Sequence, residues 1–173
     1  DTAFGVAANV CDETVALAAG GTEKRYTING VVRADQSYGD VLQEMTTACA
    51  GTLFWGTGKW KLHVGAYSAP VKDFTLDDIR SSISLQTRVN LRDQFNKVQG
   101  VFTDAGSGFI PVDYPPIESA AFKAQDNGVE QVLDLDLPFT TSASAAQRLA
   151  KLTLFRGREQ MSFTADFGLS AFE

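Results

Sequence analysis

The chain has 173 residues with a formal net charge of −6 at pH 7, and 44% of its residues are hydrophobic. The acidic balance provides no general electrostatic attraction to nucleic acid or anionic lipid, and no apolar run reaches the roughly 18 residues that a membrane span needs. We therefore expect a soluble chain of one compact unit or two closely packed lobes, with no specific nucleic-acid binding and no membrane span.

A segment of weak pattern precedes the first predicted helix. Residues 4–18 are small and weakly patterned. Gly20 and Gly21 predict a turn that leads into an extended run around Tyr26 and Ile28.

A helix is predicted over residues 38–50. Ser37 and Asp40 stand three residues apart, which resembles a capping box with Asp in place of Glu, and Gly51 stands where a helix-ending glycine belongs. An apolar stripe with the period of a helix lies between them, at Val41, Leu42, Met45, Ala48 and Cys49.

The stretch GTLFWGTGKWKLHVG, residues 51–65, predicts a β-hairpin with a four-residue loop at residues 56–59. One face of its two strands collects apolar side chains: Leu53, Trp55, Trp60, Leu62 and Val64. We expect Trp55 and Trp60 to belong to the core or to a subunit contact. A platform on which a sugar or a base stacks is the alternative.

Residues 75–90 predict a helical turn followed by a strand. Thr75 and Asp78 mark the start of the turn. The strand SISLQTRVN, residues 82–90, is expected to be half buried on the face that carries Ile83, Leu85, Thr87 and Val89.

Residues 96–103 predict a strand that is interrupted by a glycine. Val98 and Phe102 share one face, and Gly100 lies between them, where we expect another backbone to approach closely. The rest of the chain predicts a turn-rich loop over 104–119, a strand over 129–138, a helix from the Thr-Thr-Ser cluster at 140–142 to about 158, and a strand over 161–172.

The two cysteines are expected to be free. Cys49 lies on the apolar face of a predicted helix, which favours a buried thiol, and a Cys11–Cys49 disulfide is the alternative. His63 is the single histidine and shows no ligand spacing to either cysteine, so we predict no zinc site and a solvated strand position for His63.

The tetrad Gly56-Thr57-Gly58-Lys59 has the composition of a phosphate-binding loop but not its context. A Walker motif needs Ser or Thr after the lysine, where Trp60 stands, and it needs a strand before it and a helix after it. Here a helix is predicted upstream of the tetrad and a strand downstream of it, so we interpret the tetrad as a hairpin turn.

Two carboxylate pairs, Asp77 with Asp78 and Asp134 with Asp136, are candidates for acid–base chemistry or calcium binding. No glycine-punctuated Asp loop surrounds Asp134 and Asp136, and a solvated strand face explains them. Since the chain also lacks the common catalytic motifs, we predict no enzyme, no catalytic residue, no cofactor and no metal site. A cell-wall hydrolase that uses Asp134 or Asp136 is kept as an alternative.

The order of these motifs resembles the phage tail-tip and baseplate-hub family that includes the lambda-type host specificity protein J. The likeness runs from about residue 10 to residue 167. It consists of a helix ending in Ala-Gly before a Trp-containing hairpin, a Leu-Asp-Asp turn at 76–78, an Arg at 88 or 92 before Phe95-Asn96, and Pro-Phe-Thr-Thr-Ser at 138–142.

The resemblance implies a structural role in a phage or prophage tail tip. It implies a β-rich α+β fold with two main helices, in which residues 1–80 form an accessory helix and hairpin lobe and residues 81–173 a tube-like β domain with one helix. It also implies a homotrimeric hub in host attachment and DNA delivery, in contact with other tail-tip, tail-tube and tape-measure proteins. We expect a fragment of such a hub, located in the virion tail tip after assembly in the host cytoplasm. A carbohydrate-binding module that uses Trp55 and Trp60 is the alternative function.

Overall fold

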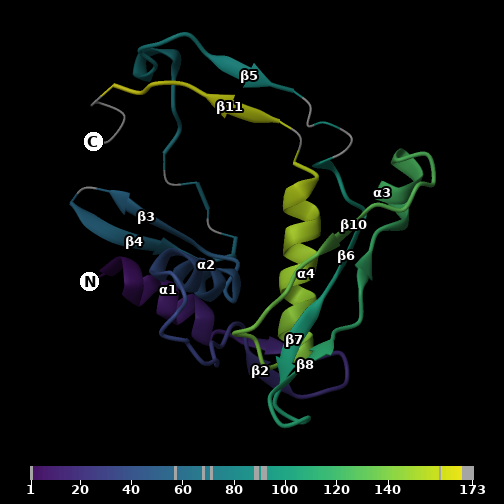
Figure 1. The fold of residues 1–173 in the computed structure, drawn as a ribbon. Coiled ribbons are helices and arrows are strands. Elements are labelled where there is room, and N and C mark those ends of the chain that lie inside the picture. Colours follow the sequence, from purple (N-terminus) through teal and green to yellow (C-terminus); the bar gives the residue numbers. More distant parts are fainter. Residues whose placement is uncertain are drawn as a thin grey trace.

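The chain folds as a mixed α+β structure, as the sequence predicts (Figure 1). The computed structural model describes residues 2–56, 58–67, 69–70, 72–87, 90, 93–159 and 161–168. The helices are α1 (Thr2–Asp12), α2 (Tyr38–Thr47), α3 (Ala120–Gln125) and α4 (Ala143–Gly157), with a 3-10 turn η1 (Leu76–Asp78). The strands are β1 (Thr14–Ala16), β2 (Thr22–Lys24), β3 (Thr52–Gly56), β4 (Lys59–His63), β5 (Ser84–Gln86), β6 (Lys97–Gln99), β7 (Val101–Asp104), β8 (Ile110–Asp113), β9 (Ile117–Glu118), β10 (Val132–Asp134) and β11 (Ser162–Thr164).

The strands form small separate sheets. The largest has the order β10–β6–β9, in which β10 runs parallel to β6 and β9 runs antiparallel to it. The parallel pair requires a crossover, which the chain makes through β7, β8, β9 and α3. The other strands pair as β1–β2, β3–β4, β7–β8 and β5–β11, so the described strands close no barrel.

The core lies where α4 packs against β6, β7 and β9. Helix α4 begins at Ser142, whose side chain accepts a hydrogen bond from the backbone N–H of Ala145, as the predicted cap requires. Val98 and Phe102 are both buried, as their shared face predicts. The buried face of α4 consists of Ala145, Ala146, Leu149, Ala150 and Leu154. The same apolar cluster includes Ala7, Tyr26, Cys49 and Val64 from the N-terminal half of the chain.

Gly100 separates β6 from β7 at the point where β10 approaches. Its φ is +151°, and a Cβ atom at this position would overlap the backbone of Leu135. On either side of it, Leu135 donates its N–H to Gln99 at 2.7 Å and Leu137 donates to Val101 at 2.8 Å. The predicted close backbone approach is therefore confirmed, and only glycine meets both requirements without strain.

A buried ionic network joins the end of α4 to α3 and β6. Arg158 and Asp126 form a two-pronged ion pair, with Nη1 and Oδ1 2.9 Å apart, and their side chains are 6% and 2% exposed. Asn96 donates to Asp126 at 2.7 Å, and the Arg158 guanidinium lies 4.9 Å from the centre of the Phe122 ring. These bonds hold the pKa of the Asp126 carboxyl below its ordinary value, mainly through Arg158 and next through Asn96.

Several local predictions are wrong. The sequence pattern predicts neither α1 nor α3, and the predicted loop over 104–119 contains strands β8 and β9. The turn at Gly20 and Gly21 is confirmed between β1 and β2, but no strand forms around Tyr26 and Ile28. Instead Tyr26 is buried, and its hydroxyl donates to the carbonyl of Gly65 at 2.6 Å.

Helix α2 is confirmed, with a different ending. The Ser37 hydroxyl accepts a hydrogen bond from the Asp40 N–H at 3.2 Å. At the other end the left-handed residue is Ala50, with φ +47°, and not Gly51. Ala50 donates to Thr47 at 3.0 Å and Gly51 donates to Thr46 at 2.8 Å, which is the hydrogen-bond pattern of a Schellman motif.

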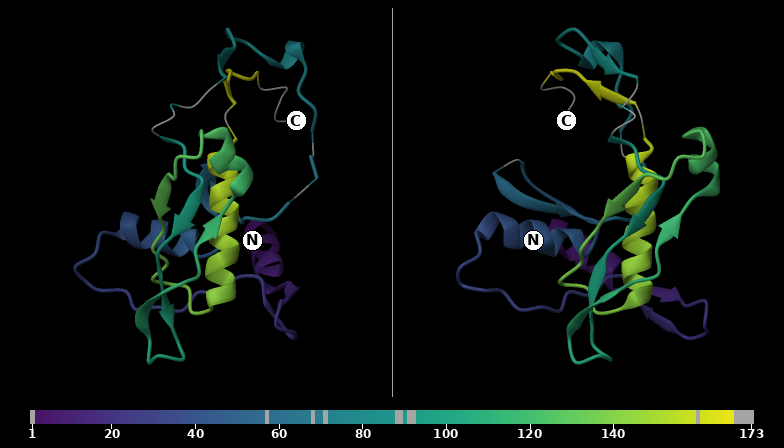
Figure 2. Two further views of the ribbon diagram at one scale, coloured as in Figure 1. Left: turned by 90° about the vertical axis from the view of Figure 1, so that its right-hand side faces the viewer. Right: turned by 45° about the vertical axis from the view of Figure 1, so that its right-hand side comes forward.

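Strands β5 and β11 pair with each other in a projecting ribbon, shown at the top of Figure 1. The views in Figure 2 place this ribbon away from α1, α2 and the hairpin β3–β4. Ile83 and Leu85 are about half exposed, so the predicted burial of one face is wrong within this chain. Val89 lies outside the described residues. None of the helices in the described part has the length and apolarity to cross a membrane.

Candidate interaction surface

The hairpin β3–β4 presents both tryptophans to solvent. Trp55 pairs with Trp60 across the two strands and Gly56 with Lys59, so the loop has two residues and not the predicted four. The indole rings lie 5.4 Å apart at an interplanar angle of 74°. Trp55 is 60% exposed and Trp60 52%, so neither belongs to the core of this chain. The part of the prediction that names a subunit contact is still to be tested.

The exposed indoles do not form a flat stacking platform. A sugar or base that stacks on two rings at once needs them nearly coplanar, whereas these two meet edge to face. This geometry argues against the carbohydrate-binding alternative, although the exposure of both rings is compatible with it.

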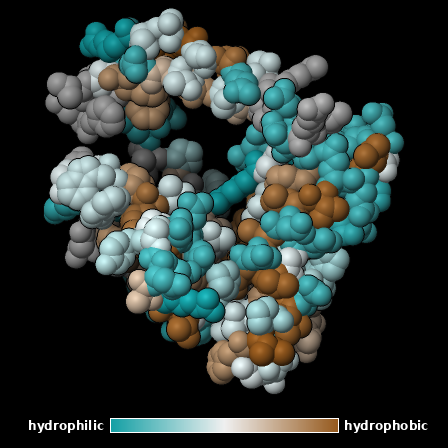
Figure 3. Space-filling model, viewed as in Figure 1, coloured by the Kyte–Doolittle hydropathy of each residue, from teal (hydrophilic) through white to brown (hydrophobic). Residues whose placement is uncertain are grey.

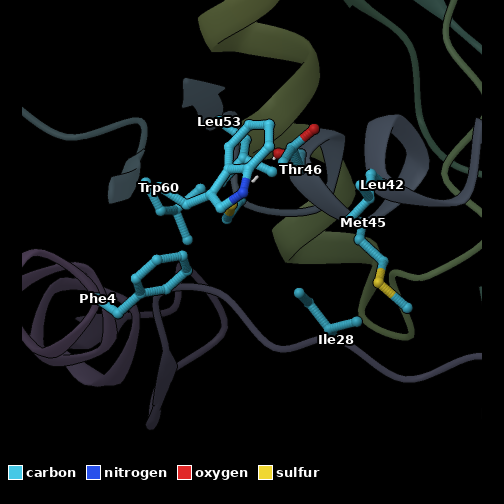
Figure 4. A pocket seen from close by; sticks show the side chains of 9 residues that line it. Phe4, Ile28, Leu42, Met45, Thr46, Leu53 and Trp60 are labelled. Atoms are coloured by element: carbon cyan, nitrogen blue, oxygen red, sulfur yellow. Dashed lines mark hydrogen bonds between the residues drawn. The ribbon is translucent and has the colours of Figure 1, made fainter. Parts of the chain in front are cut away.

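An apolar pocket of about 570 Å³ lies beside Trp60 (Figure 4). Helices α1 and α2, the segment after β2 and the hairpin contribute its walls. Its lining residues are Phe4, Ile28, Leu42, Met45, Thr46, Cys49, Leu53, Trp60 and Leu62. The Thr46 hydroxyl donates to the Gln43 carbonyl at 2.9 Å and the Cys49 thiol donates to the Thr46 carbonyl at 3.3 Å, so these two polar side chains are engaged within α2.

Three features of the sequence explain this pocket. The apolar stripe of α2 supplies Leu42, Met45 and Cys49, and the apolar face of the hairpin supplies Trp60. Phe4 completes one wall from α1. Sequence reasoning found the first two contributions and missed the third, because the small residues of α1 carry no clear helical signal.

Both cysteines are free thiols, as predicted. Cys49 is 3% exposed, and burial raises the pKa of its thiol, with a further contribution from the nearby Cys11. Burial also raises the pKa of Cys11, followed by the effect of Asp12. A raised pKa leaves little reactive thiolate at neutral pH, so neither cysteine has the environment of a nucleophile.

The glycine tetrad forms the hairpin turn. Gly58 has φ +73° and Gly56 ends β3, so the segment joins two antiparallel strands and does not lead into a helix. Thr57 lies outside the described residues. A phosphate loop needs backbone amides at the start of a helix, which this turn lacks.

The candidate ligands and acids are dispersed. His63 is exposed at the end of β4, as predicted. Asp78 accepts a hydrogen bond from the Thr75 N–H at 2.9 Å, which lowers the pKa of this carboxyl and closes the predicted capping turn. Within the described residues, no group of His, Cys, Asp and Glu side chains has the arrangement of a metal site.

Asp134 and Asp136 lie on the exposed face opposite the core, as the alternation predicts. Asp134 accepts from the Gln99 side chain at 3.1 Å and Asp136 from the Val101 N–H at 3.4 Å. They border a polar groove with Asp113. Both carboxylates thus help to hold β10 and its continuation beside β6 and β7. Because these hydrogen bonds give both carboxylates a structural role, the alternative of a cell-wall hydrolase gains no further support.

The elements from α2 to the C-terminus correspond to a known protein family. Residues 37–173 match the family described as "Putative phage tail protein". No curated protein matches the chain. The matched region starts at the Ser37 cap of α2 and takes in the hairpin, the ribbon β5–β11 and the α4 core. The chain therefore belongs to this family of phage tail proteins.

Proposed function

We propose that this chain is a non-enzymatic structural part of a phage or prophage tail tip, and that it works by burying its exposed apolar surfaces against neighbouring subunits. The family supports a place in the tail. The position at the tip, the trimeric hub and the role in host attachment and DNA delivery are our proposal.

The size of the accessible surface carries this proposal. The chain exposes 11,796 Å². A compact monomer of its 18.6 kDa mass is expected to expose about 8,200 Å². A permanent interface buries about 2,000–5,000 Å² in total, about half of it on each partner. Two such interfaces would therefore remove about 2,000–5,000 Å² from one chain, a range that includes the excess of about 3,600 Å².

The apolar character of the excess supports the same conclusion. Large apolar side chains are more than 40% exposed over α1, the segment after β2, the hairpin, the ribbon β5–β11 and the β7–β8 turn. Figure 3 shows such side chains on several parts of one face of the molecule. On the hairpin and the ribbon such side chains lie next to one another, as Trp55 and Trp60 do and as Leu85 and Phe163 do, and the usual reason for exposed apolar clusters is an interaction site.

The proposed partners follow from the place in the tail. They are other copies of the chain together with tail-tip, tail-tube and tape-measure proteins, and the complex would assemble in the host cytoplasm before it becomes part of the virion.

We keep the division into an accessory part, residues 1–80, and a β-rich part, residues 81–173, within this proposal. Because no barrel closes within the described part of one chain, a tube-like arrangement would have to form between copies.

Electron microscopy of purified tails tests this proposal. An epitope tag in the turn between β1 and β2, at Gly20 and Gly21, lies outside the surfaces proposed to be buried, and gold-labelled antibody against it should place label at one end of each tail. Label along the whole tube would contradict the tip position, and particles without the protein would contradict the structural role.

A further inference from the structure

The residues before the family-matched region contribute to its core. The match begins at residue 37, and we call residues 2–29, which contain α1, β1, β2 and the run after β2, the strap. Ala7 and Tyr26 of the strap are buried in the same hydrophobic cluster as Leu149 of α4. The core of the matched region is therefore incomplete without side chains that the strap supplies.

On one side the strap holds the hairpin part, which we define as residues 38–65 with α2, β3 and β4. Helix α1 packs against β4, below the hairpin in Figure 1. The Tyr26 hydroxyl donates to the Gly65 carbonyl at 2.6 Å, and the Gly65 N–H donates to the Cys49 carbonyl at 2.9 Å. The buried Tyr26 thus reaches the point where the segments after β4 and after α2 meet.

On the other side the strap holds the start of α4. Glu23 accepts hydrogen bonds from Nη2 of Arg148 and from the hydroxyl of Ser142, each at 2.8 Å. The side chains of the ion pair between Glu23 and Arg148 are 22% and 24% exposed. Nearby, the Asn29 N–H donates to the Phe139 carbonyl at 3.0 Å. A charged pair that is largely shielded from water interacts more strongly than one on the surface, so Glu23 is the main polar anchor of the strap on α4.

Direct contact between the hairpin part and the α4 core is smaller. Arg156, near the end of α4, donates to the Ala50 carbonyl at 2.9 Å, and Cys49 and Val64 join the central hydrophobic cluster. Among the described elements, none of α2, β3 and β4 packs extensively against α4, β6 or β7. The strap contacts both sides, so it provides much of the connection between them.

The strap also supplies one side of the Trp60 pocket. Phe4 and Ile28 line the pocket from the strap, and in Figure 4 they lie below Trp60 and Thr46. Without them this side of the pocket would be open. We propose that the strap is an internal clasp, which fixes the tryptophan hairpin at one position on the α4 core and closes the pocket beside it. The clasp acts within one chain, so it does not depend on the proposed place in the tail.

Cutting the chain after it has folded tests the clasp. Residues 30–35 are exposed and lie between the strap and α2, so a recognition site for a specific protease can be inserted between Ala34 and Asp35. Cleavage separates residues 1–34 from residues 35–173. At about 10 μM we expect both pieces to stay together in gel filtration and native mass spectrometry, with an unchanged circular dichroism spectrum. Spontaneous loss of the strap at this concentration, or unfolding of both pieces, would overturn the proposal.

A matched pair of substitutions tests the anchor on α4. Glu23→Gln removes the charge that pairs with Arg148, whereas Glu13→Gln removes the same charge from an ion pair with Arg25 that lies within the strap. In the cut protein we expect Glu23→Gln to raise the dissociation constant of the strap by more than about tenfold and Glu13→Gln by less than about threefold. Gel filtration of a dilution series, in urea below the unfolding transition, measures both constants. Equal effects would overturn the assignment of Glu23 as the anchor.

The position of the hairpin gives a readout that a gain in stability alone would not change. Spin labels on unnatural amino acids at Lys59 and Lys151, which are both exposed, report the distance between the hairpin and α4 by pulsed electron paramagnetic resonance. We expect a narrow distribution of distances in the uncut protein and a broader one once dilution of the cut protein has released the strap. A second pair of labels, at Glu118 and Lys151, lies within the α4 core and should keep its distance.

Two results of this measurement would contradict the clasp. If the hairpin keeps a narrow distribution after the strap is released, the strap does not position the hairpin. If both pairs of labels broaden together, the strap only supports the fold as a whole and has no separate role in positioning.

Discussion

Replacing Gly100 with alanine should destabilise the protein far more than a usual glycine substitution. Gly100 has φ +151°, a region that other residues enter only at a cost of about 1–3 kcal/mol. The added Cβ would also overlap the Leu135 backbone and force β10 and its continuation away from β6 and β7. Weakening the two hydrogen bonds that Leu135 and Leu137 donate there adds about 1 kcal/mol each, so we expect a loss of about 3–5 kcal/mol in the free energy of unfolding.

The matched control is Gly108→Ala in the turn between β7 and β8. Gly108 also has a positive φ, +78°, but nothing lies within 4 Å of a Cβ at this position. Its loss should be limited to backbone strain of about 1–2 kcal/mol. Urea unfolding followed by circular dichroism measures both variants, with the slope m as a check that the same surface unfolds. Equal losses in the two variants would refute the argument that close backbone approach demands glycine at residue 100.

Three further predictions concern acid sensitivity, thiol reactivity and the exposed indole. The pKa of Asp126 is lowered in the folded state, so the ion pair with Arg158 stabilises the protein fully at pH values above 3.8, the ordinary pKa of an Asp carboxyl, and less as the pH falls below that value. Urea unfolding from pH 6 to pH 3 should therefore show a steeper loss of unfolding free energy for the unaltered protein than for Asp126→Asn. Cys49 should react with iodoacetamide more than about tenfold more slowly in the folded protein than in urea, because burial both shields the thiol and raises its pKa. Mass spectrometry measures the two rates, and equal rates would contradict the burial of Cys49. Trp60→Ala should lower the free energy of unfolding of the monomer by about 1–2 kcal/mol, because half of the side chain is already in water and the rest packs edge to face with Trp55. A loss of about 3–5 kcal/mol would restore the core assignment that the structure rejects.

Local sequence signals were accurate where the hydrogen bonds of an element form between residues that are close together in the sequence. The Ser37 and Ser142 caps, the Thr75 turn and the hairpin around Trp55 and Trp60 all depend on residues within a few positions of each other. Their hydrogen bonds are local, so residue type and spacing suffice to predict them. Membership of a phage tail protein family was also recognisable from the order of these pieces, because that order is itself a property of the sequence, whereas the likeness to the tail-tip hub stays a prediction.

The tertiary structure alone decided which apolar residues are covered. Trp60 and Leu85 have the same alternating pattern as Val98, yet Val98 is fully buried against the α4 core while the other two remain half exposed. Alternation identifies a strand face that avoids water, but it does not say whether the same chain or another one supplies the cover. The Trp60 pocket likewise depends on α1, α2 and the hairpin meeting in space, and no local pattern contains that distance information.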